Sequence, residues 1–308
     1  MSSSLKQKIQ FKLITAFCSW VERELEGKTA EEVIDFGHFI GRLAMMFPVK
    51  GKREILPSLK KLLPERNDHE EIYKKIFIEQ TGRLLPDALL AFKKGSKENF
   101  PYKVKYENYD YLDELIKRGK GVIITTGHFG NWEVFLQAMV WRGVATSVVQ
   151  RQHHNEKINE FITNKREMNG AQAINFHRRR PESFRQCLEA LKQGRVLGVL
   201  VDVVPKTRTV DVNFMGKKFA APMGPALMAQ MTGAAIVPGY NVREGDVYRC
   251  VMCEELVWPN EKPSRDDISA MTVKIMASLE AAIRQHPDNW IWYLRRWREL
   301  PFDVELGS

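Results

Sequence analysis

The sequence predicts an α/β fold, in which helices flank a mostly parallel central sheet and a helical region precedes that sheet. One observation is the run from Val122 to Thr126, whose β-branched residues are typical of a strand buried on both faces. Another is that short apolar runs alternate with longer segments of helical period from about residue 100 onward. Because parallel strands are joined by long crossovers, which are usually helices, this alternation favours a parallel sheet.

The chain divides into a helical region over residues 1–95 and an α/β core over residues 96–308 that is expected to form one structural unit. A length of 308 residues is enough for one large domain, and no linker in the sequence requires a second. Residues 52–94 are mostly helical in pattern, and Pro86 is expected to end or kink the helix that contains it.

The core elements follow from apolar runs, glycines and prolines. An edge strand is expected around Val104 and Tyr106, and the other strands at 122–126, 145–150, 171–175, 196–202, 235–241 and 247–253. Helices are expected at 109–117, 131–141, 155–169, 182–193, 225–232 and 265–286. Residues 211–220 are typical of a hairpin that turns at Met215 and Gly216.

The stretch from Gly127 to Glu133 carries the candidate chemistry. His128 follows the buried strand directly, Asn131 suits a helix N-cap, and Glu133 falls in the first turn of the next helix. Ligands collect at the carboxyl ends of parallel strands, and a helix N-terminus offers unpaired N–H groups to developing negative charge. We therefore expect His128 to be a general base and Glu133 to hold its ring and stabilise the imidazolium.

The N–H groups near Gly130 to Trp132 are expected to stabilise an oxyanion, so Gly130 and Asn131 are candidate substrate-binding residues. A simpler interpretation remains open, in which His128 is an ordinary hydrogen-bonded histidine and Glu133 only complements the helix dipole.

Basic residues suggest the partner. The formal net charge is +9 and the pI about 9.3, which favours an anionic membrane face, an acidic carrier protein, a phosphorylated substrate or nucleic acid. Arg151 comes just after a predicted strand end, where a guanidinium would suit phosphate. The triplet Arg178 to Arg180 is expected to be a solvated surface patch instead.

No metal site is expected. Cys250 and Cys253 form a C-x-x-C pair inside a predicted strand, without the second pair or nearby histidine that a zinc site needs. His153, His154 and His177 are interpreted as loop histidines, since no pattern holds two of them on one face with His128.

The N-terminal apolar segments, residues 11–21 and 33–47, are too short or too interrupted to cross a bilayer. They predict two amphipathic helices that lie in a membrane interface. Packing on the core of a soluble protein is an equal alternative.

His128 to Glu133, His-Phe-Gly-Asn-Trp-Glu, resembles the His-x4-Asp/Glu signature of the lysophospholipid acyltransferase superfamily. The Gly-Asn-Trp-Glu version is similar to that of bacterial lipid A biosynthesis (lauroyl/myristoyl) acyltransferases. The similarity continues over roughly residues 100 to 300, through Phe214-Met215-Gly216 and the tryptophan-rich stretch 289–298. The resemblance implies a glycerolphosphate-acyltransferase-like fold and a membrane-associated acyltransferase of lipid A and lipopolysaccharide biosynthesis, and hence of lipid metabolism.

The implied reaction moves a fatty acyl chain from an acyl carrier protein thioester, or acyl-CoA, to a hydroxyl of a phosphorylated glycolipid. The thioester supplies the driving force, so no metal or redox cofactor is implied. The implied location is the cytoplasmic face of a bacterial inner membrane, with peripheral or monotopic attachment.

The resemblance also singles out Arg166 and Asp202 as substrate-contacting or structural positions, and places the block containing Gly216 and Gly224 at the border of the active site. This chain departs from the family pattern after Asp202, where Val203 stands in place of the usual glutamine. Phe214, Phe219, Met223 and Leu227 suit an acyl groove or ordinary core packing equally well.

Two alternatives differ in function class. One is an acyltransferase for another acceptor, such as a lysophospholipid or a mannosylated inositol lipid. The other is a basic protein that binds membrane or nucleic acid without catalysis. The basic residues are dispersed and no nucleic-acid motif is present, so nucleic acid is not an expected partner.

Overall fold

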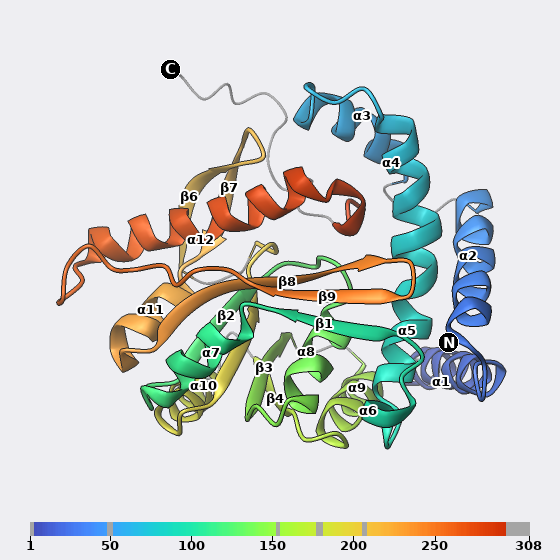
Figure 1. Ribbon diagram of the computed structural model, residues 1–308, viewed down its shortest axis with the longest axis horizontal. Helices are drawn as coiled ribbons and strands as arrows, with labels where there is room; N and C mark the ends of the chain where they lie inside the picture. The colour runs from blue at the N-terminus through green and yellow to red at the C-terminus, as the bar shows by residue number, and fades with distance from the viewer. Residues whose placement is uncertain (1–2, 48–51, 152–154, 177–180, 205–207, 294–308) are drawn as a thin grey trace.

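A computed structural model describes residues 3–47, 52–151, 155–176, 181–204 and 208–293 (Figure 1). His153, His154, His177, Arg178 to Arg180 and residues 294–298 of the tryptophan-rich end lie outside these ranges. The core is built on a seven-stranded sheet of order β1-β9-β8-β2-β5-β3-β4. Strands β8, β2, β5, β3 and β4 run parallel, and β9 is antiparallel to β8 but parallel to β1. The sheet is therefore mostly parallel, as predicted.

The strands lie close to the predicted positions. They are β1 (Lys103–Glu107), β2 (Val122–Thr126), β3 (Thr146–Arg151), β4 (Gln172–Phe176), β5 (Val196–Leu200), β8 (Ala235–Glu244) and β9 (Val247–Met252). β2 lies in the middle of the sheet, between β5 and β8, and all five of its residues are buried. The β-branched run at 122–126 therefore forms a central strand because both of its faces are covered.

Two layers of helices cover the sheet. Ile124 and Val122 of β2 pack with α7 (Tyr109–Lys117) and α8 (Trp132–Trp141), whereas Ile123 packs into a second cluster on the opposite face. That second cluster includes side chains of α10 (Pro181–Lys192), α11 (Gly224–Thr232) and α12 (Arg265–Gln285). Successive residues of a strand point to opposite faces, so one buried strand connects both layers. Helix α9 (Glu156–Glu167) packs against β4, and the 3₁₀ turn η2 (Pro287–Asn289) follows α12.

The predicted hairpin is present as β6 (Thr209–Phe214) and β7 (Lys217–Pro222), which pair antiparallel. Met215 has φ 53° and Gly216 has φ 70°, so both central residues of the turn are left-handed. Two left-handed residues in a two-residue loop are typical of a type I′ turn, whose twist matches that of the strands.

Helices precede the sheet and gather at one side of the core (Figure 1). They are α1 (Ser3–Glu24), α2 (Ala30–Met46), α3 (Lys52–Leu62), α4 (His69–Lys75), the π-helical η1 (Ile76–Thr81), α5 (Gly82–Ala91) and the short α6 (Ser96–Asn99). Helix α2 begins with a capping box in which Thr29 and Glu32 bond to each other's backbone N–H groups. Among the described residues, no helix is both long and apolar enough to cross a bilayer.

Of the two outcomes expected at Pro86, an end or a kink, the helix end is not observed, because α5 runs through Pro86 to Ala91. Proline removes one helical hydrogen bond, but seven of the ten α5 residues are buried against neighbouring elements. Tertiary packing therefore outweighs the local preference of proline.

Candidate active site

His128 lies two residues past the end of β2, and its ring contacts Asp202. The ring Nδ1 is 2.8 Å from Oδ1 of Asp202, and the backbone N–H of His128 donates to Oδ2 at 2.9 Å. β5 ends at Leu200, so Asp202 lies two residues past the strand next to β2. Parallel neighbours end at the same edge of a sheet, and this topology brings the two side chains together.

Hydrogen-bonding chemistry assigns the roles of the two groups. Asp202 is fully buried, whereas the side chain of His128 is 24% exposed. An ionised carboxylate only accepts hydrogen bonds, so Nδ1 carries the proton and donates to Asp202. Nε2 then keeps its lone pair and is the basic atom of the ring.

Glu133 has a different partner from the one expected. It forms a two-bonded ion pair with Arg166 of α9, in which Nε donates to Oε2 at 3.0 Å and Nη2 donates to Oε1. The indole of Trp132 also donates to Glu133 at 3.0 Å, and Arg166 donates a further hydrogen bond to Gln150. The prediction that Glu133 holds the His128 ring is therefore wrong in its geometry, because the first turn of α8 directs Glu133 toward α9.

Trp132 connects the two pairs. Its ring lies edge-on to the His128 ring, with centroids 4.9 Å apart and an interplanar angle of 73°. The same indole donates to Glu133, so the Glu133–Arg166 pair restrains the side chain that packs against His128.

Gly130 and Asn131 shape the loop that carries His128. Gly130 has φ 55°, and a Cβ at this position would lie 2.0 Å from the backbone oxygen of Asn241. Its N–H donates to Asn289 O at 2.8 Å, and its carbonyl accepts from the Gln80 side chain. The Asn131 N–H donates to Oδ1 of Asn241 at 2.9 Å.

Gly130 and Asn131 were expected to present N–H groups to an oxyanion, but the structure uses both inside the protein. Asn131 is also the N-cap of α8, as predicted, since its side chain accepts from Val134 N. The third of these N–H groups belongs to Trp132, the first residue of α8. At that position the helix contains no carbonyl that could accept its hydrogen bond.

The other predicted residues lie on separate elements. Arg166 is 7% exposed and is held by Glu133 and Gln150. Arg151 is exposed at the end of β3. Gly216 lies in the hairpin turn, and Gly224 opens α11 where a Cβ would meet no atom within 4 Å.

A further residue of the site is Trp290, from the tryptophan-rich stretch 289–298 that carries part of the family resemblance. Its indole N–H donates to Oδ2 of Asp202 at 3.0 Å, and Phe129 forms a β-bridge with Trp290. Ile291 N–H donates to the backbone oxygen of His128 at 3.1 Å, so the segment after η2 lies along the His128 loop. The concentration of tryptophan near the C-terminal end was the signal for this contact.

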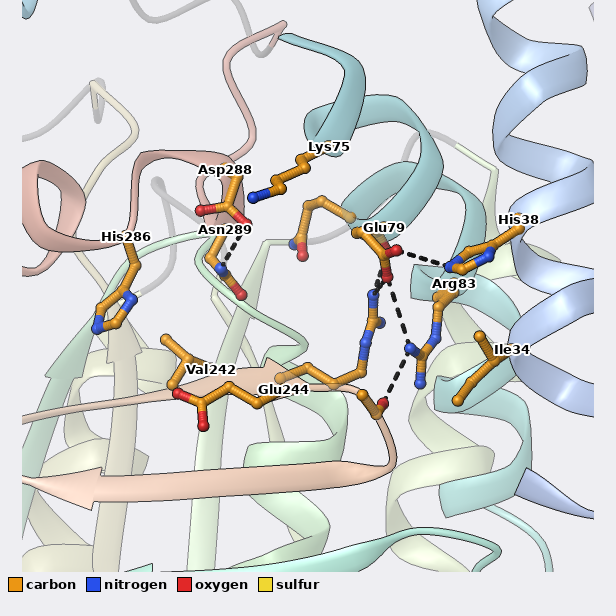
Figure 2. Close-up of a pocket in the computed structure, with 13 residues that line it drawn as sticks. Ile34, His38, Lys75, Glu79, Arg83, Val242, Glu244, His286, Asp288 and Asn289 are labelled. Carbon is orange, nitrogen blue, oxygen red and sulfur yellow. Dashed lines mark hydrogen bonds and ion pairs between the residues drawn. The ribbon is translucent and has the colours of Figure 1, made fainter. Parts of the chain in front are cut away.

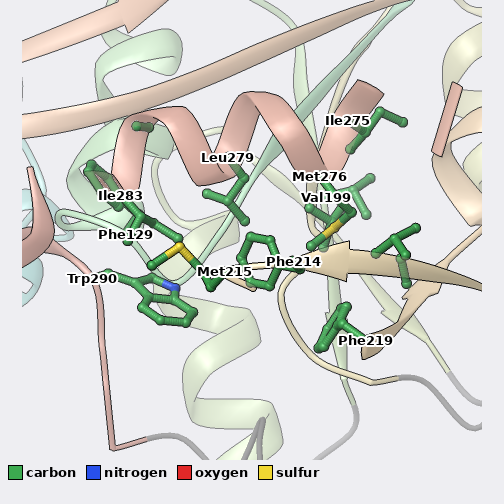
Figure 3. Close-up of a cluster of buried hydrophobic side chains, with 14 of the residues drawn as sticks. Phe129, Val199, Phe214, Met215, Phe219, Ile275, Met276, Leu279, Ile283 and Trp290 are labelled. Atoms are coloured by element: carbon green, nitrogen blue, oxygen red, sulfur yellow. The ribbon is translucent and has the colours of Figure 1, made fainter. Parts of the chain in front are cut away.

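The hairpin side chains belong to the core beside Trp290 (Figure 3). Phe214 and Phe219 are both fully buried, and Phe214 meets the Trp290 ring edge-on at 5.9 Å. Of the two interpretations left open for these phenylalanines, core packing is the one observed.

A small apolar crevice lies between α8 and strands β2, β3 and β5. Its volume is about 20 Å³, with Trp132, Glu133, Thr126 and Leu200 at the end nearest the His128 loop. Ile124, Met139, Val148 and Gly198 line it farther down the sheet.

The cysteines are free thiols, with Cys18, Cys187 and Cys250 buried and Cys253 half-buried. Within the described part of the chain, no group of three or more His, Cys, Asp or Glu side chains is arranged to hold a metal ion.

Comparison with known proteins finds phosphatidylinositol mannoside acyltransferases among the relatives of this chain. Over 194 residues the chain is 27% identical to a phosphatidylinositol mannoside acyltransferase of Mycobacterium tuberculosis (strain CDC 1551 / Oshkosh), covering 61% of this chain and 58% of that protein. The protein of the same name from Mycolicibacterium smegmatis is 27% identical over 192 residues, covering 61% of this chain and 60% of the relative. These matches thus span less than two thirds of either relative.

Among solved structures, the 1-acyl-sn-glycerophosphate (LPA) acyltransferase PlsC from Thermotoga maritima aligns with 83% of this chain and 97% of its own. The similarity is weak, with a TM-score of 0.37 and 12% sequence identity.

A family model described as bacterial lipid A biosynthesis acyltransferase matches residues 28–299. This range includes both residues of the His128–Asp202 pair, the Glu133–Arg166 pair and Trp290. Because the match covers most of the sequence, the chain belongs to the bacterial lipid A biosynthesis acyltransferase family.

Proposed function

We propose that this protein transfers a fatty acyl group from a thioester donor to a hydroxyl of a phosphorylated glycolipid. The observation that carries the proposal is the His128–Asp202 pair, in which a buried carboxylate 2.8 Å from Nδ1 leaves Nε2 as a base beside the family motif. Family membership supports the reaction class.

In the proposed mechanism, the oxygen of the acceptor hydroxyl attacks the thioester carbonyl while Nε2 of His128 takes the proton of that hydroxyl. The new C–O bond forms, and the carbonyl oxygen becomes an oxyanion. Collapse of this intermediate breaks the C–S bond, and the imidazolium returns its proton to the leaving thiolate. The proton, the acyl group and the thiol are then all accounted for without a further reactant.

Asp202 has two tasks in this sequence. It fixes the tautomer that leaves Nε2 basic, and its negative charge stabilises the imidazolium that forms during attack. Because Asp202 is fully buried, this charge is poorly screened by water. The N–H of Trp132 at the start of α8 is our candidate donor to the oxyanion.

We assign the crevice under Trp132 to the first carbons of the donor acyl chain. Its lining is apolar, and it begins beside residues that contact the His128 ring or its neighbours. A volume of about 20 Å³ admits only a small group, so the chain would have to displace side chains such as Met139, which adapts its shape readily. The net charge of +9 suits an acidic acyl carrier protein, with acyl-CoA as the second donor.

The proposed acceptor is a lipid A precursor, in line with the description of the matching family. A mannosylated inositol lipid is the second candidate, because the relatives described above are named for that class of acceptor. Both are glycolipids with a free hydroxyl, and the proposed chemistry is the same for either.

We further propose that α1 and α2 attach the protein to the cytoplasmic face of a bacterial inner membrane, in peripheral or monotopic fashion. Seven large apolar side chains are exposed on these helices and at the end of α2: Ile9, Leu13, Phe17, Phe39, Leu43, Met46 and Phe47. Exposed apolar side chains concentrated on two adjacent helices are typical of interfacial binding.

The reaction is tested by mass spectrometry of mixed micelles that contain the purified protein, carrier protein loaded with C12 to C16 chains, and a lipid A precursor. The proposal expects the mass of one acyl group to be added to the precursor, and this gain to fall by roughly 10²-fold or more in His128→Ala. His69→Ala is the matched control, since His69 lies outside the site and its ring hydrogen-bonds to Leu63 O. Near-normal transfer by His128→Ala would contradict the mechanism, and transfer only to a mannosylated inositol lipid would replace the acceptor.

A further inference from the structure

A polar cavity of about 340 Å³ lies between α2, η1, α5, the end of β8 and η2 (Figure 2). Its wall includes His38, Glu79, Arg83, Arg243, His286 and Asp288. This volume is within the range of small-molecule sites, which starts at about 300 Å³. None of the wall residues belongs to the mechanism proposed for His128.

The cavity adjoins the His128 loop from the β8 side. Gln80 and Asn289 both line it, and both hydrogen-bond to the backbone of Gly130, two residues from His128. Asp202 approaches His128 from the opposite side, because β5 and β8 flank β2 on its two edges. The cavity and the catalytic carboxylate therefore lie on different sides of one loop.

Arg83 supplies an unused donor in this wall. Arg83 is fully buried, and its Nη1 donates to Gly245 O at 3.1 Å. Its Nε is 3.5 Å from Asp87, and within the described part of the chain its Nη2 has no hydrogen-bond partner. A buried donor without a partner costs about 1–3 kcal/mol, so this nitrogen favours a ligand that brings an acceptor oxygen.

The position of this guanidinium is set by a close helix crossing. A Cβ at Gly37 of α2 would lie 2.4 Å from Cγ of Arg83, and a Cβ at Gly41 would lie 2.4 Å from Phe77 O. Glycine at both positions lets α2 approach η1 and α5 closely. The side chain of Arg83 is thereby packed closely against α2.

Charge decides the class of ligand. Arg243 pairs with Glu79 at 3.0 Å and with Asp87 at 3.1 Å, and Arg83 lies 3.6 Å from Glu79. Two guanidinium groups thus face two carboxylates, and the charges cancel. At the rim, Lys75 lies 2.7 Å from Glu71. Since each of these cations already has an anionic partner, a phosphate would find no surplus positive charge.

The remaining groups suit hydroxyls. Asp288 accepts only from its neighbour Asn289 among the bonds described for it, at 3.2 Å, so its oxygens have room for further donors. His286 is held neutral, because burial lowers the pKa of its ring. A hydroxyl accepts from Arg83 and donates to a carboxylate without bringing charge, whereas a phosphate would bring negative charge next to Glu79, Glu244 and Asp288.

We propose that this cavity binds a neutral, hydroxyl-rich ring of the size of a sugar, with Arg83 donating to one ring oxygen and Asp288 accepting from another. Two molecules could provide this ring: the acceptor lipid, through its headgroup, or a separate free sugar. Only the first source rests on the function proposed above.

The test uses full-length His128→Ala protein in detergent micelles, which binds without turnover, and saturation-transfer NMR with methyl α-mannoside and myo-inositol as probes. The expected result is magnetic saturation passing from the protein to a bound probe. The affinity for that probe should be at least about tenfold weaker in Arg83→Lys and in Asp288→Asn, as the loss of one hydrogen bond to a charged group predicts. Arg195→Lys is the matched control, since Arg195 bonds Ser147 and Thr146 outside the cavity.

Asp288→Asn keeps the test decisive if Arg83→Lys fails to fold, because Asp288 is half-buried at the surface. A probe signal that a lipid A precursor displaces identifies the acceptor headgroup as the source, and one that it leaves unchanged identifies a separate sugar. Binding of inorganic phosphate in place of the probes would overturn the proposal, as would the same probe affinity in both variants or no binding at all. The readout needs no transfer activity, so failure of the proposed reaction would leave this result standing.

Discussion

The indole N–H of Trp290 donates to Oδ2 of Asp202 at 3.0 Å, and that same oxygen accepts from the backbone N–H of His128. The other oxygen of Asp202 faces Nδ1 of His128. The carboxylate is thus held in one orientation by donors from two segments that are far apart in the sequence. Trp290 is fully buried, so water does not replace this hydrogen bond.

We expect Trp290→Phe to lower the transfer rate by about 10-fold to 100-fold, since a hydrogen bond to a charged group contributes about 1.5–3 kcal/mol. Phenylalanine retains most of the ring packing but removes the donor. Transfer rates and circular dichroism of the variant check this. Trp292→Phe is the control, because Trp292 donates to the backbone oxygen of Pro287. Equal losses in the two variants would show that Trp290 acts through general packing.

Glu133→Gln is expected to act mainly on stability. The ion pair with Arg166 is largely buried, with side-chain exposures of 12% and 9%, so removing one charge leaves the other uncompensated. Breaking such a pair costs about 3–5 kcal/mol. Urea unfolding should show this decrease, with Glu182→Gln as control because its pair with Arg185 is exposed. An unchanged unfolding midpoint together with complete loss of transfer would restore Glu133 to a direct catalytic role.

Gly130→Ala is expected to disrupt the His128 loop. Alanine would need φ 55° and would place its Cβ 2.0 Å from Asn241 O, so the backbone must move. Gly27→Ala is matched in backbone, with φ 71°, but meets no atom within 4 Å and should cost only about 1 kcal/mol. Thermal unfolding and transfer assays compare the two. Similar effects of both substitutions would mean that the close approach at Gly130 is not rigid.

Alkaline pH is expected to destabilise the fold. Burial raises the pKa of Tyr106 to about 12 and also raises the pKa values of Tyr102, Tyr109 and Tyr248, with Asp87 adding to the effect at Tyr102 and Tyr248. A pKa above the unfolded value of about 10 means that the stability is fully present below pH 10 and is lost as pH rises through the folded values. Tyrosinate absorbance should therefore rise for these four residues only together with unfolding. Full ionisation near pH 10 in a folded protein would contradict the burial.

The sequence predicted the sheet well because its signals are local. The β-branched run at 122–126, the Asn131 cap and the Met215-Gly216 turn each depend on neighbouring residues, and all three are observed. The helix end considered at Pro86 is the exception, because α5 is buried and continues past that proline.

The partner of His128 could not be obtained in the same way. Glu133 is five residues away and was the nearest carboxylate in the motif, whereas Asp202 is 74 residues away and Trp290 lies a further 88 residues beyond Asp202. Only the strand order, which puts β5 beside β2, brings these side chains to one edge. The position of His128 is a local property, and the identity of its partner is a property of the whole sheet.

The most direct test of the His128–Asp202 pair is a double-mutant cycle on the transfer rate with His128→Ala, Asp202→Asn and both together. If Asp202 acts through the His128 ring, Asp202→Asn should reduce the rate by about 10²-fold or more, and the double variant should be no slower than His128→Ala alone. Additive losses in the double variant would contradict the account, since they would mean that the carboxylate contributes to transfer independently of the imidazole.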